Sequence, residues 1–242
     1  METIDAYARR YALDELLSAD LLLLLRLVVR ASGELVIGSG EPARELMFFV
    51  EGRTKSFSTL DNGQSILASF ARPFDVFGEA EILSSERYTL SIEAIEDSAF
   101  LTLPTIAVKK AAERNCRLFM YLCGRLGAKL SNRIIAESIN LRYSVENRLA
   151  SYLLASMDDE GQVLGTDDLG EIADFIGSSY RQLARVVRRF RDEGILESER
   201  GRVRVLDLAA LEPLAGDLYP RSGPAERSRA VAAIRPRLGI RR

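Results

Sequence analysis

The stretch 168–196, DLGEIADFIGSSYRQLARVVRRFRDEGIL, constrains the fold more strongly than any other part of the chain. Its apolar residues recur at helical spacing in two short runs, which are separated by Gly-Ser-Ser. Gly177 suits the left-handed conformation that ends a helix. Asp168 with Glu171, and Ser179 with Gln182, have the spacing of capping boxes at the starts of the two helices. The stretch therefore predicts two amphipathic helices joined by a tight turn, the helix-turn-helix motif.

The second of these helices, expected at about 179–191, has one apolar and one basic face. Its apolar stripe consists of Leu183, Val186, Val187 and Phe190, and its other face carries Tyr180, Arg181, Gln182, Arg185, Arg188 and Arg189. A bracing helix followed by an arginine-bearing helix is the arrangement that enters a DNA major groove. The alternative is a helical hairpin whose arginines are simply solvated. The short turn, and the restriction of the basic residues to the second helix, favour DNA.

A short hairpin is expected directly after the second helix. Leu196 begins a strand, the segment 199–202 can make the turn, and Val203-Arg204-Val205 alternates apolar and basic residues. A helix-turn-helix followed by such a hairpin is a winged helix. Arg200, Arg202 and Arg204 then lie where a wing meets phosphates.

The composition limits where nucleic acid can bind and where the protein can act. The chain has 242 residues and a net charge of −2, so any contact with nucleic acid must come from local charge such as the helix just described. The apolar run Leu21–Val29 is too short to span a membrane, and the N-terminus lacks the apolar region of a signal peptide. Two cysteines provide no disulfide framework. We expect a cytoplasmic protein of one large or two ordinary domains.

The chain contains no histidine, which narrows the chemistry available to it. Cys116 and Cys123 alone are too few to hold zinc or an iron-sulfur cluster within one chain. Histidine-dependent catalysis is excluded, and carboxylates such as Glu79 and Glu81 stand without a base or metal partner in the sequence. We therefore expect no enzyme activity, no metal and no cofactor.

Between Arg26 and Leu103 the pattern is one of short strands with glycine turns, after a short helix near 14–24. The expected strands are Leu35–Ile37, Leu46–Val50, Arg53–Leu60, Gln64–Phe70, Val76–Phe77, Thr89–Ile95 and Ala99–Leu103. Asp61-Asn62-Gly63 is a strong hairpin signal, and Gly40, Gly52 and Gly78 fall between strands. The region predicts a compact antiparallel roll or barrel.

From Pro104 to about Asn140 the period is helical, and two apolar stripes run along the helix. One stripe contains Leu118, Leu122, Leu126, Leu130 and Ile134; the other is closer to a heptad seam and contains Cys116, Phe119, Cys123, Leu126 and Leu130. We expect one stripe to cover the roll and the seam to meet a second subunit. The alternative is a helix packed wholly inside its own domain.

The two cysteines lie seven residues apart on this helix, about 10 Å along its axis, which is too far for a disulfide within it. At a dimer seam Cys123 can face its own symmetry mate and form a redox-sensitive disulfide. The alternative is that both cysteines act as small apolar side chains.

The predicted organisation has four parts: 1–105, a sensor roll; 106–142, a dimerisation helix and hinge; 143–215, a winged-helix domain; and 216–242, a basic and mobile tail. Within the third part, Ser144 can cap a helix that runs through Leu154, a polar loop follows at 158–161, and a last short helix is expected at 207–215. The tail is rich in arginine and has no periodic apolar face. It can add nonspecific phosphate contacts or have no fixed role.

Residues 13–212 resemble the CRP/FNR superfamily of bacterial transcription regulators. The resemblance is carried by LVIGSGEPARELMFFVEGRTKSF, by FDVFGEAEIL and by EIADFIGSSYRQLARVVRRFRDEGIL, in this order. The YeiL-type subgroup is the most similar, particularly through GSSYRQL. The resemblance implies an α+β fold with an N-terminal cyclic-nucleotide-binding-like antiparallel roll of the jelly-roll type, a long dimer helix and a C-terminal winged helix. It also implies a homodimer that binds double-stranded DNA, contacts RNA polymerase and responds to an effector at the roll. The alternatives for the effector are a ligand other than a cyclic nucleotide, or constitutive DNA binding by a degenerate sensor.

The resemblance also defines effector-pocket candidates, namely Gly78, Glu79, Tyr88, Thr89 and Arg133. In cAMP-binding members Gly78-Glu79 would hold the ribose and cyclic phosphate region. The phosphate-pairing arginine and its following serine fall on Tyr88 and Thr89, and the adenine-reading pair falls on Arg133 and Ile134. Arg87 is one residue early, which turns its side chain to the other face of a strand. We therefore expect no tight binding of cAMP, since the phosphate lacks its bidentate partner. The iron-sulfur and haem-binding branches are excluded for lack of ligands.

Roles on DNA follow for the second helix. Ser179 and the helix N-terminus are expected at a backbone phosphate, and Tyr180, Arg181, Arg185 and Arg188 at base edges or flanking phosphates. Arg185 matches the family position that most often reads guanine, and Arg181 replaces a glutamate common in the family. Two such helices in a dimer imply a palindromic operator with half-sites about 34 Å apart. The alternative function is a ligand- or thiol-sensing module that acts mainly through protein partners.

Overall fold

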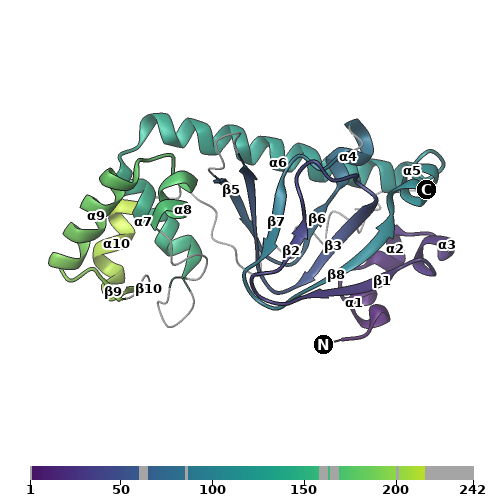
Figure 1. Ribbon diagram of the computed structural model, residues 1–242, viewed down its shortest axis with the longest axis horizontal. Coiled ribbons are helices and arrows are strands. Elements are labelled where there is room, and N and C mark those ends of the chain that lie inside the picture. Colours follow the sequence, from purple (N-terminus) through teal and green to yellow (C-terminus); the bar gives the residue numbers. More distant parts are fainter. Residues whose placement is uncertain are drawn as a thin grey trace, which may run out of the picture. The chain divides into compact units, whose positions relative to one another are not determined.

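The computed structural model describes residues 2–59, 65–84, 87–157, 163, 169–199 and 202–215. The described residues form two compact units (Figure 1). Of the described residues, the first unit contains those up to Thr54 together with Ala71–Lys129, and the second contains those of Lys55–Phe70 together with 130–215. The predicted hairpin turn at Asp61-Asn62-Gly63, the polar loop 158–161, Asp168, Arg200 and the tail 216–242 lie outside the described residues.

The first unit begins with three short helices, α1 (Ile4–Arg10), α2 (Leu13–Leu16) and α3 (Ala19–Leu22). The sequence pattern did not indicate α1, although the Thr3 hydroxyl caps it by accepting a hydrogen bond from Ala6 N. The prediction of a single helix near 14–24 was wrong, because Leu17 and Ser18 adopt extended conformations and divide the segment into α2 and α3.

One antiparallel sheet of the roll has the strand order β1-β8-β3-β6. Its strands are β1 (Arg26–Arg30), β3 (Glu45–Glu51), β6 (Asp75–Phe77) and β8 (Ser98–Pro104). In the β3–β8 ladder Phe48 lies opposite Leu101 and Phe49 opposite Phe100. Strand β1 was missed at the level of sequence, because the continuous apolar run before it shows no alternation.

The other sheet has the order β2-β7-β4-β5. Its strands are β2 (Leu35–Ile37), β7 (Ser91–Ala94), β4 (Thr54–Thr59) and β5 (Ser65–Ala71). All seven strands expected between 35 and 103 are therefore present, and Gly40, Gly52 and Gly78 adopt positive φ angles at turns as expected. The predicted roll and the α+β class are confirmed.

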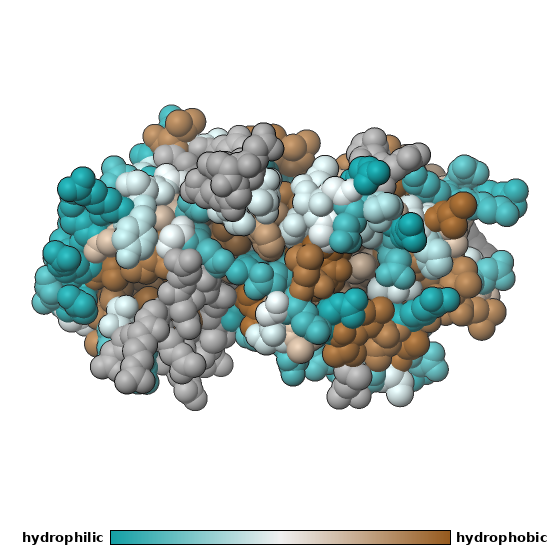
Figure 2. Space-filling view, in the orientation of Figure 1, coloured by the Kyte–Doolittle hydropathy of each residue, from teal (hydrophilic) through white to brown (hydrophobic). Residues whose placement is uncertain are grey.

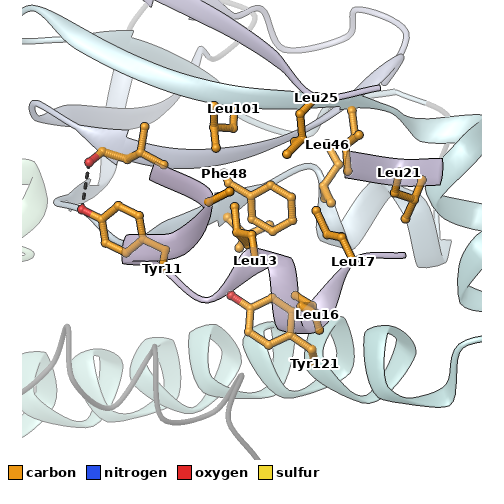
Figure 3. Packing of buried hydrophobic residues seen from close by; sticks show 14 of the residues in the cluster. Tyr11, Leu13, Leu16, Leu17, Leu21, Leu25, Leu46, Phe48, Leu101 and Tyr121 are labelled. Atoms are coloured by element: carbon orange, nitrogen blue, oxygen red, sulfur yellow. Dashed lines mark hydrogen bonds between the residues drawn. The ribbon is translucent and has the colours of Figure 1, made fainter. Parts of the chain in front are cut away.

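The main core of the first unit lies between the N-terminal helices, the first sheet and the helix that follows the roll. In Figure 3, Phe48 lies between Leu101 and Leu46 above and Leu13 below, and Tyr121 lies beside Leu16 on the lower side of the cluster. The Tyr11 ring stacks on Phe74 with 4.7 Å between centroids, and its hydroxyl donates to Val50 O at 2.9 Å. Leu118, Tyr121 and Leu122 belong to the same cluster. The predicted stripe therefore covers the roll only at its start, through Leu118 and Leu122, whereas Leu130 and Ile134 of the same stripe are exposed.

The helical region after the roll consists of α5 (Thr105–Ala112) and α6 (Cys116–Arg142), and not of one continuous helix as expected. Asn115 lies at the break. Its side-chain oxygen accepts a hydrogen bond from Leu118 N at 3.1 Å, and its amide group donates to Leu16 O at 3.3 Å. The break therefore depends on a contact with α2 that the local sequence does not reveal.

The second unit contains α7 (Val145–Ser156), α8 (Leu169–Phe175), α9 (Tyr180–Asp192), β9 (Leu196–Glu199), β10 (Arg202–Val205) and α10 (Leu208–Ala215). Its core is built around Leu153, Ile172, Leu183 and Phe190 from α7, α8 and α9. The predicted helix-turn-helix, hairpin and last helix are all present. Across the described part of the chain, we find no helix that combines the length and the hydropathy needed to cross a bilayer.

Candidate nucleic-acid interface

The turn between α8 and α9 is fixed by a specific arrangement of backbone hydrogen bonds. Gly177 has φ +63°, Ser178 N donates to Ala173 O at 2.8 Å, and Gly177 N donates to Asp174 O at 3.1 Å. These two bonds form a Schellman motif, which reverses the chain directly after a helix. The predicted role of Gly177 as the residue that ends the first helix is confirmed.

A buried arginine supports this turn from α7. Arg148 is only 6% exposed, and its Nη1 donates to Ile176 O and, at 2.9 Å, to Gly177 O. These carbonyls follow the helix and have no helical donor of their own. The sequence analysis did not single out Arg148. The available signal was a lone arginine between Val145 and Leu149 on the apolar side of a helix.

Ser179 begins the second helix of the motif as its N-cap. Its side-chain oxygen accepts a hydrogen bond from Gln182 N at 3.3 Å, as predicted. The other half of the expected capping box differs, because the Gln182 side-chain oxygen accepts from the Ser178 hydroxyl at 3.4 Å. The N-terminus of α9 is therefore capped, and Ser179 and Tyr180 at this end are exposed.

Helix α9 has the two-faced character that its sequence predicts. Leu183, Val187 and Phe190 are buried, whereas the predicted DNA-contacting side chains are exposed, namely Ser179, Tyr180, Arg181, Gln182, Arg185 and Arg188. Tyr180 at the first helical position is 59% exposed. Figure 2 shows a largely hydrophilic surface over α9. Helix α9 therefore has an exposed face that carries arginines and an opposite apolar face that is buried.

One arginine of this helix is engaged inside the unit. Arg189 forms an ion pair with Glu146 of α7 through Nη2, and its Nε lies 3.7 Å from Glu193 Oε1. These carboxylates raise the pKa of the Arg189 guanidinium, first of all through the hydrogen bond with Glu146. Arg189 therefore links α9 to α7, while Arg181, Arg185 and Arg188 follow one another along the exposed face.

Strands β9 and β10 form the expected wing. The pair is antiparallel, with Arg202 opposite Glu199 and Arg204 opposite Glu197. Val203 and Val205 are buried and Arg204 is exposed, which matches the predicted alternation. Arg202 begins β10.

In the first unit, Gly78 and Glu79 lie where β6 meets α4 (Glu79–Ser84), a helix that the sequence analysis did not identify. Gly78 has φ +92°, and a Cβ there would lie 2.8 Å from Glu45 O, so the close approach of β3 requires glycine. Glu79 is 3% exposed, and burial raises the pKa of its carboxyl despite the nearby ammonium of Lys129.

The remaining effector-pocket candidates make other contacts. The buried Tyr88 hydroxyl donates to Glu45 O at 2.7 Å, and the Thr89 hydroxyl donates to Glu81 Oε1 at 2.8 Å. Burial raises the pKa of the Tyr88 phenol. Among the five candidates, Gly78 and Tyr88 are neighbours in the structure. A Cβ atom added at position 78 would lie 3.6 Å from Cε1 of the Tyr88 ring. Arg133 is exposed on the part of α6 that belongs to the second unit.

The residues of the predicted dimer seam are exposed or half-buried in the single chain. Phe119 and Leu130 are exposed, the latter to 60%, while Cys123 and Leu126 are half-buried. Both cysteines are reduced in the structure, Cys116 being exposed. An exposed apolar stripe on a long helix is the surface that a helical partner would cover.

Together, an antiparallel roll, a long helix and a winged helix-turn-helix whose second helix carries exposed arginines define a class of DNA-binding transcription regulators. The comparisons with known proteins agree. Residues 27–115 match the cyclic nucleotide-binding domain, and residues 147–214 match the Crp-like helix-turn-helix domain.

The similar proteins are transcription regulators of one family. The chain is 30% identical over 193 residues to the transcriptional regulator LdrP of Thermus thermophilus, covering 77% of this chain and 95% of that protein. It is 26% identical over 188 residues to the regulatory protein YeiL of Escherichia coli O157:H7, covering 77% and 84%. A regulator of the CRP/FNR family from Eubacterium rectale has the same fold, with a TM-score of 0.73, 21% identity, and coverage of 85% and 98%. The chain belongs to the CRP/FNR family of transcription regulators.

Proposed function

We propose that the protein is a homodimeric, sequence-specific DNA-binding regulator that inserts α9 into the major groove. The observation that carries this proposal is the geometry of α9. Its arginines at 181, 185 and 188 are exposed on one side, while its other side is fixed in the core. A rigid helix that carries planar, bidentate donors is suited to reading guanine.

Each exposed residue receives a role from its place on the helix. Ser179 and the first N–H groups of α9 bind a backbone phosphate, since the positive end of the helix dipole lies there. Tyr180 and Gln182 flank this phosphate contact. Arg185 reads a guanine, and Arg181 and Arg188 contact base edges or phosphates on either side of it. In the wing, Arg202 and Arg204 contact phosphates, which fix the register without reading sequence.

In a homodimer, two copies of α9 can bind the same DNA duplex. We assign the seam to Phe119, Cys123, Leu126 and Leu130 of α6, whose side chains are exposed or half-buried in the single chain. In this assignment residues 1–105 form the sensor, 106–142 the dimer helix and hinge, 143–215 the reading domain and 216–242 a basic tail. A twofold-symmetric reader requires a palindromic operator with half-sites about 34 Å apart.

The contacts of the sensor residues argue against cAMP as effector. A cyclic phosphate needs donors, and here the Thr89 hydroxyl donates to Glu81, the Tyr88 hydroxyl to Glu45 O and the Arg87 guanidinium to Gly40 O at 2.6 Å. The residues at this position do not fit a cyclic monophosphate. We further propose that the protein is cytoplasmic, acts through RNA polymerase and catalyses no reaction.

Selection from a random DNA pool tests the proposed function. The purified protein should enrich a palindrome whose two halves are related by twofold symmetry and lie one helical turn apart. The matched control is Arg191→Met, which changes an exposed arginine outside the proposed base-reading set and should enrich the same motif. Enrichment of no motif, or DNA binding that disappears with modest salt and shows no site preference, would contradict the proposal.

A further inference from the structure

The strongest cluster of charged groups outside the reading helix lies within the first unit, between α6 and the junction of β6 with α4. Lys129 Nζ lies 2.8 Å from Glu79 Oε1 and 3.5 Å from Asp75 Oδ1, and it donates to Val76 O at 2.5 Å. The same ammonium lies 5.1 Å from the centroid of the Phe77 ring. The Lys129 ammonium thus contacts four of the five residues of the segment 75–79.

A second ion pair lies one helical turn earlier. Arg125 Nη2 is 2.5 Å from Asp75 Oδ1. Tyr121, Arg125 and Lys129 are four residues apart on α6, so they share one face. Tyr121 and Leu122 already pack into the core of the roll. The ion pairs of Arg125 and Lys129 therefore extend the contact between α6 and the roll by two further turns.

The cluster is balanced in charge. Two cations face two carboxylates, and the Glu79 side chain is only 4% exposed whereas that of Lys129 is 35% exposed. A buried carboxylate needs such a partner, because an isolated buried charge is costly. Burial lowers the pKa of Lys129, but the Asp75 and Glu79 carboxylates outweigh it and the net pKa is raised. The ammonium therefore stays charged at neutral pH.

Glu79 is one of the residues that the family resemblance assigns to the effector pocket. We propose that Lys129 acts as a built-in ligand of the sensor, so that its ammonium engages Glu79 and holds α6 against the roll without an effector. A ligand hydroxyl that approached Glu79 would have to displace this ammonium. An anionic ligand would meet two cations that are already paired. This inference rests on the proposed function for its consequence, which is DNA binding that requires no small molecule.

Hydrogen exchange tests the contact itself, without DNA. In the full-length protein, Lys129→Met should speed exchange by about tenfold in the peptides that cover 75–84 and 116–129, because α6 and β6–α4 open together. The control Lys110→Met, at an exposed lysine on α5, should leave both peptides unchanged. Faster exchange on α6 alone, or in neither peptide, would overturn the proposed link. Lys129→Arg should restore most of the protection.

DNA binding tests the consequence. Protein that has been unfolded in guanidinium, dialysed and refolded should bind its selected duplex within about twofold of the native preparation, and millimolar cAMP or cGMP should not change the affinity. Lys129→Met should bind about fivefold or more weakly, because the competent state is less populated. If refolded protein bound tenfold or more weakly and a small-molecule extract of cells restored it, the proposal would be overturned. If neither preparation preferred any duplex, the proposed function as a sequence-specific DNA-binding protein would be wrong. The hydrogen-exchange experiment would still test the contact between Lys129 and Glu79, because it needs no DNA.

Discussion

The replacement of Arg148 by methionine tests how the reading helix is held. Methionine keeps much of the aliphatic packing but removes both hydrogen bonds from the guanidinium to Ile176 O and Gly177 O. A hydrogen bond from a charged donor contributes about 1.5–3 kcal/mol, and a buried carbonyl left without a donor costs about 1–3 kcal/mol. The combined loss should be about 3–5 kcal/mol in the free energy of opening the helix-turn-helix, since the two bonds share one donor group.

Native-state hydrogen exchange of the amides in α8 and α9 measures this free energy for the second unit alone. The expected change is an increase of about two to four powers of ten in exchange rate, because each 1.4 kcal/mol is about tenfold. Arg191→Met, at an exposed position of α9, is the matched control and should change these rates by less than about threefold. Arg148→Lys should lower the free energy of opening by about half as much as Arg148→Met, since a lysine has no planar guanidinium to reach two carbonyls.

The outcome that would refute this reasoning is specific. If Arg148→Met exchanged α8 and α9 amides within about threefold of the unsubstituted protein, the guanidinium would not support the turn. If protection were lost in α7 and α10 to the same degree, the residue would stabilise the whole unit and not the turn in particular. Affinity for the selected duplex, measured well below the unfolding temperature, should fall with the loss of protection in α9.

Three further predictions concern the sensor and the seam. The pKa of Glu79 is raised in the folded state, so the folded protein binds this proton more tightly than the unfolded chain, and the free energy of unfolding falls as pH rises from the ordinary carboxyl range through the raised value. Glu79→Gln should remove this decline in urea titrations, and a decline of unchanged size would contradict the prediction. Gly78→Ala should destabilise the first unit by about 1–3 kcal/mol, from its positive φ and the contact with Glu45 O; exchange rates unchanged in β3 and β6 would speak against it. Leu130→Glu should convert a dimer into a folded monomer in sedimentation experiments, since it would bury a charge at the seam, while Ile106→Glu, at a residue 79% exposed outside the seam, should remain dimeric.

The reading domain could be predicted well because its signals are local. Gly177, Ser179 and the apolar spacing each act within one turn of helix, so the sequence alone is sufficient to place α8, α9 and the wing. Most strands of the roll were predicted for the same reason, from short runs bounded by glycine. Strand β1 follows a continuous apolar run without alternation, and it becomes a strand only because β8 pairs with it.

The contacts that organise the candidate sites are of long range and could not be predicted. Arg148 reaches carbonyls 28 and 29 residues away, and Lys129 reaches the carbonyl of Val76 over 53 residues. No periodicity or spacing rule connects such positions in a single sequence. Helix α4 was missed because it is only six residues long, and the break before α6 depends on a contact between Asn115 and Leu16.

The central claim is that exposed arginines of α9 read bases, and Arg185 tests it most directly. Affinities of the unsubstituted protein and of Arg185→Ala should be measured at one salt concentration, on the selected duplex, on duplexes with single symmetric base changes and on a scrambled duplex. We expect Arg185→Ala to lose about 1–3 kcal/mol on the selected duplex, little on the scrambled one, and its preference at one base pair of each half-site. Equal losses on the selected and scrambled duplexes would show that Arg185 contacts only phosphates and would contradict the account.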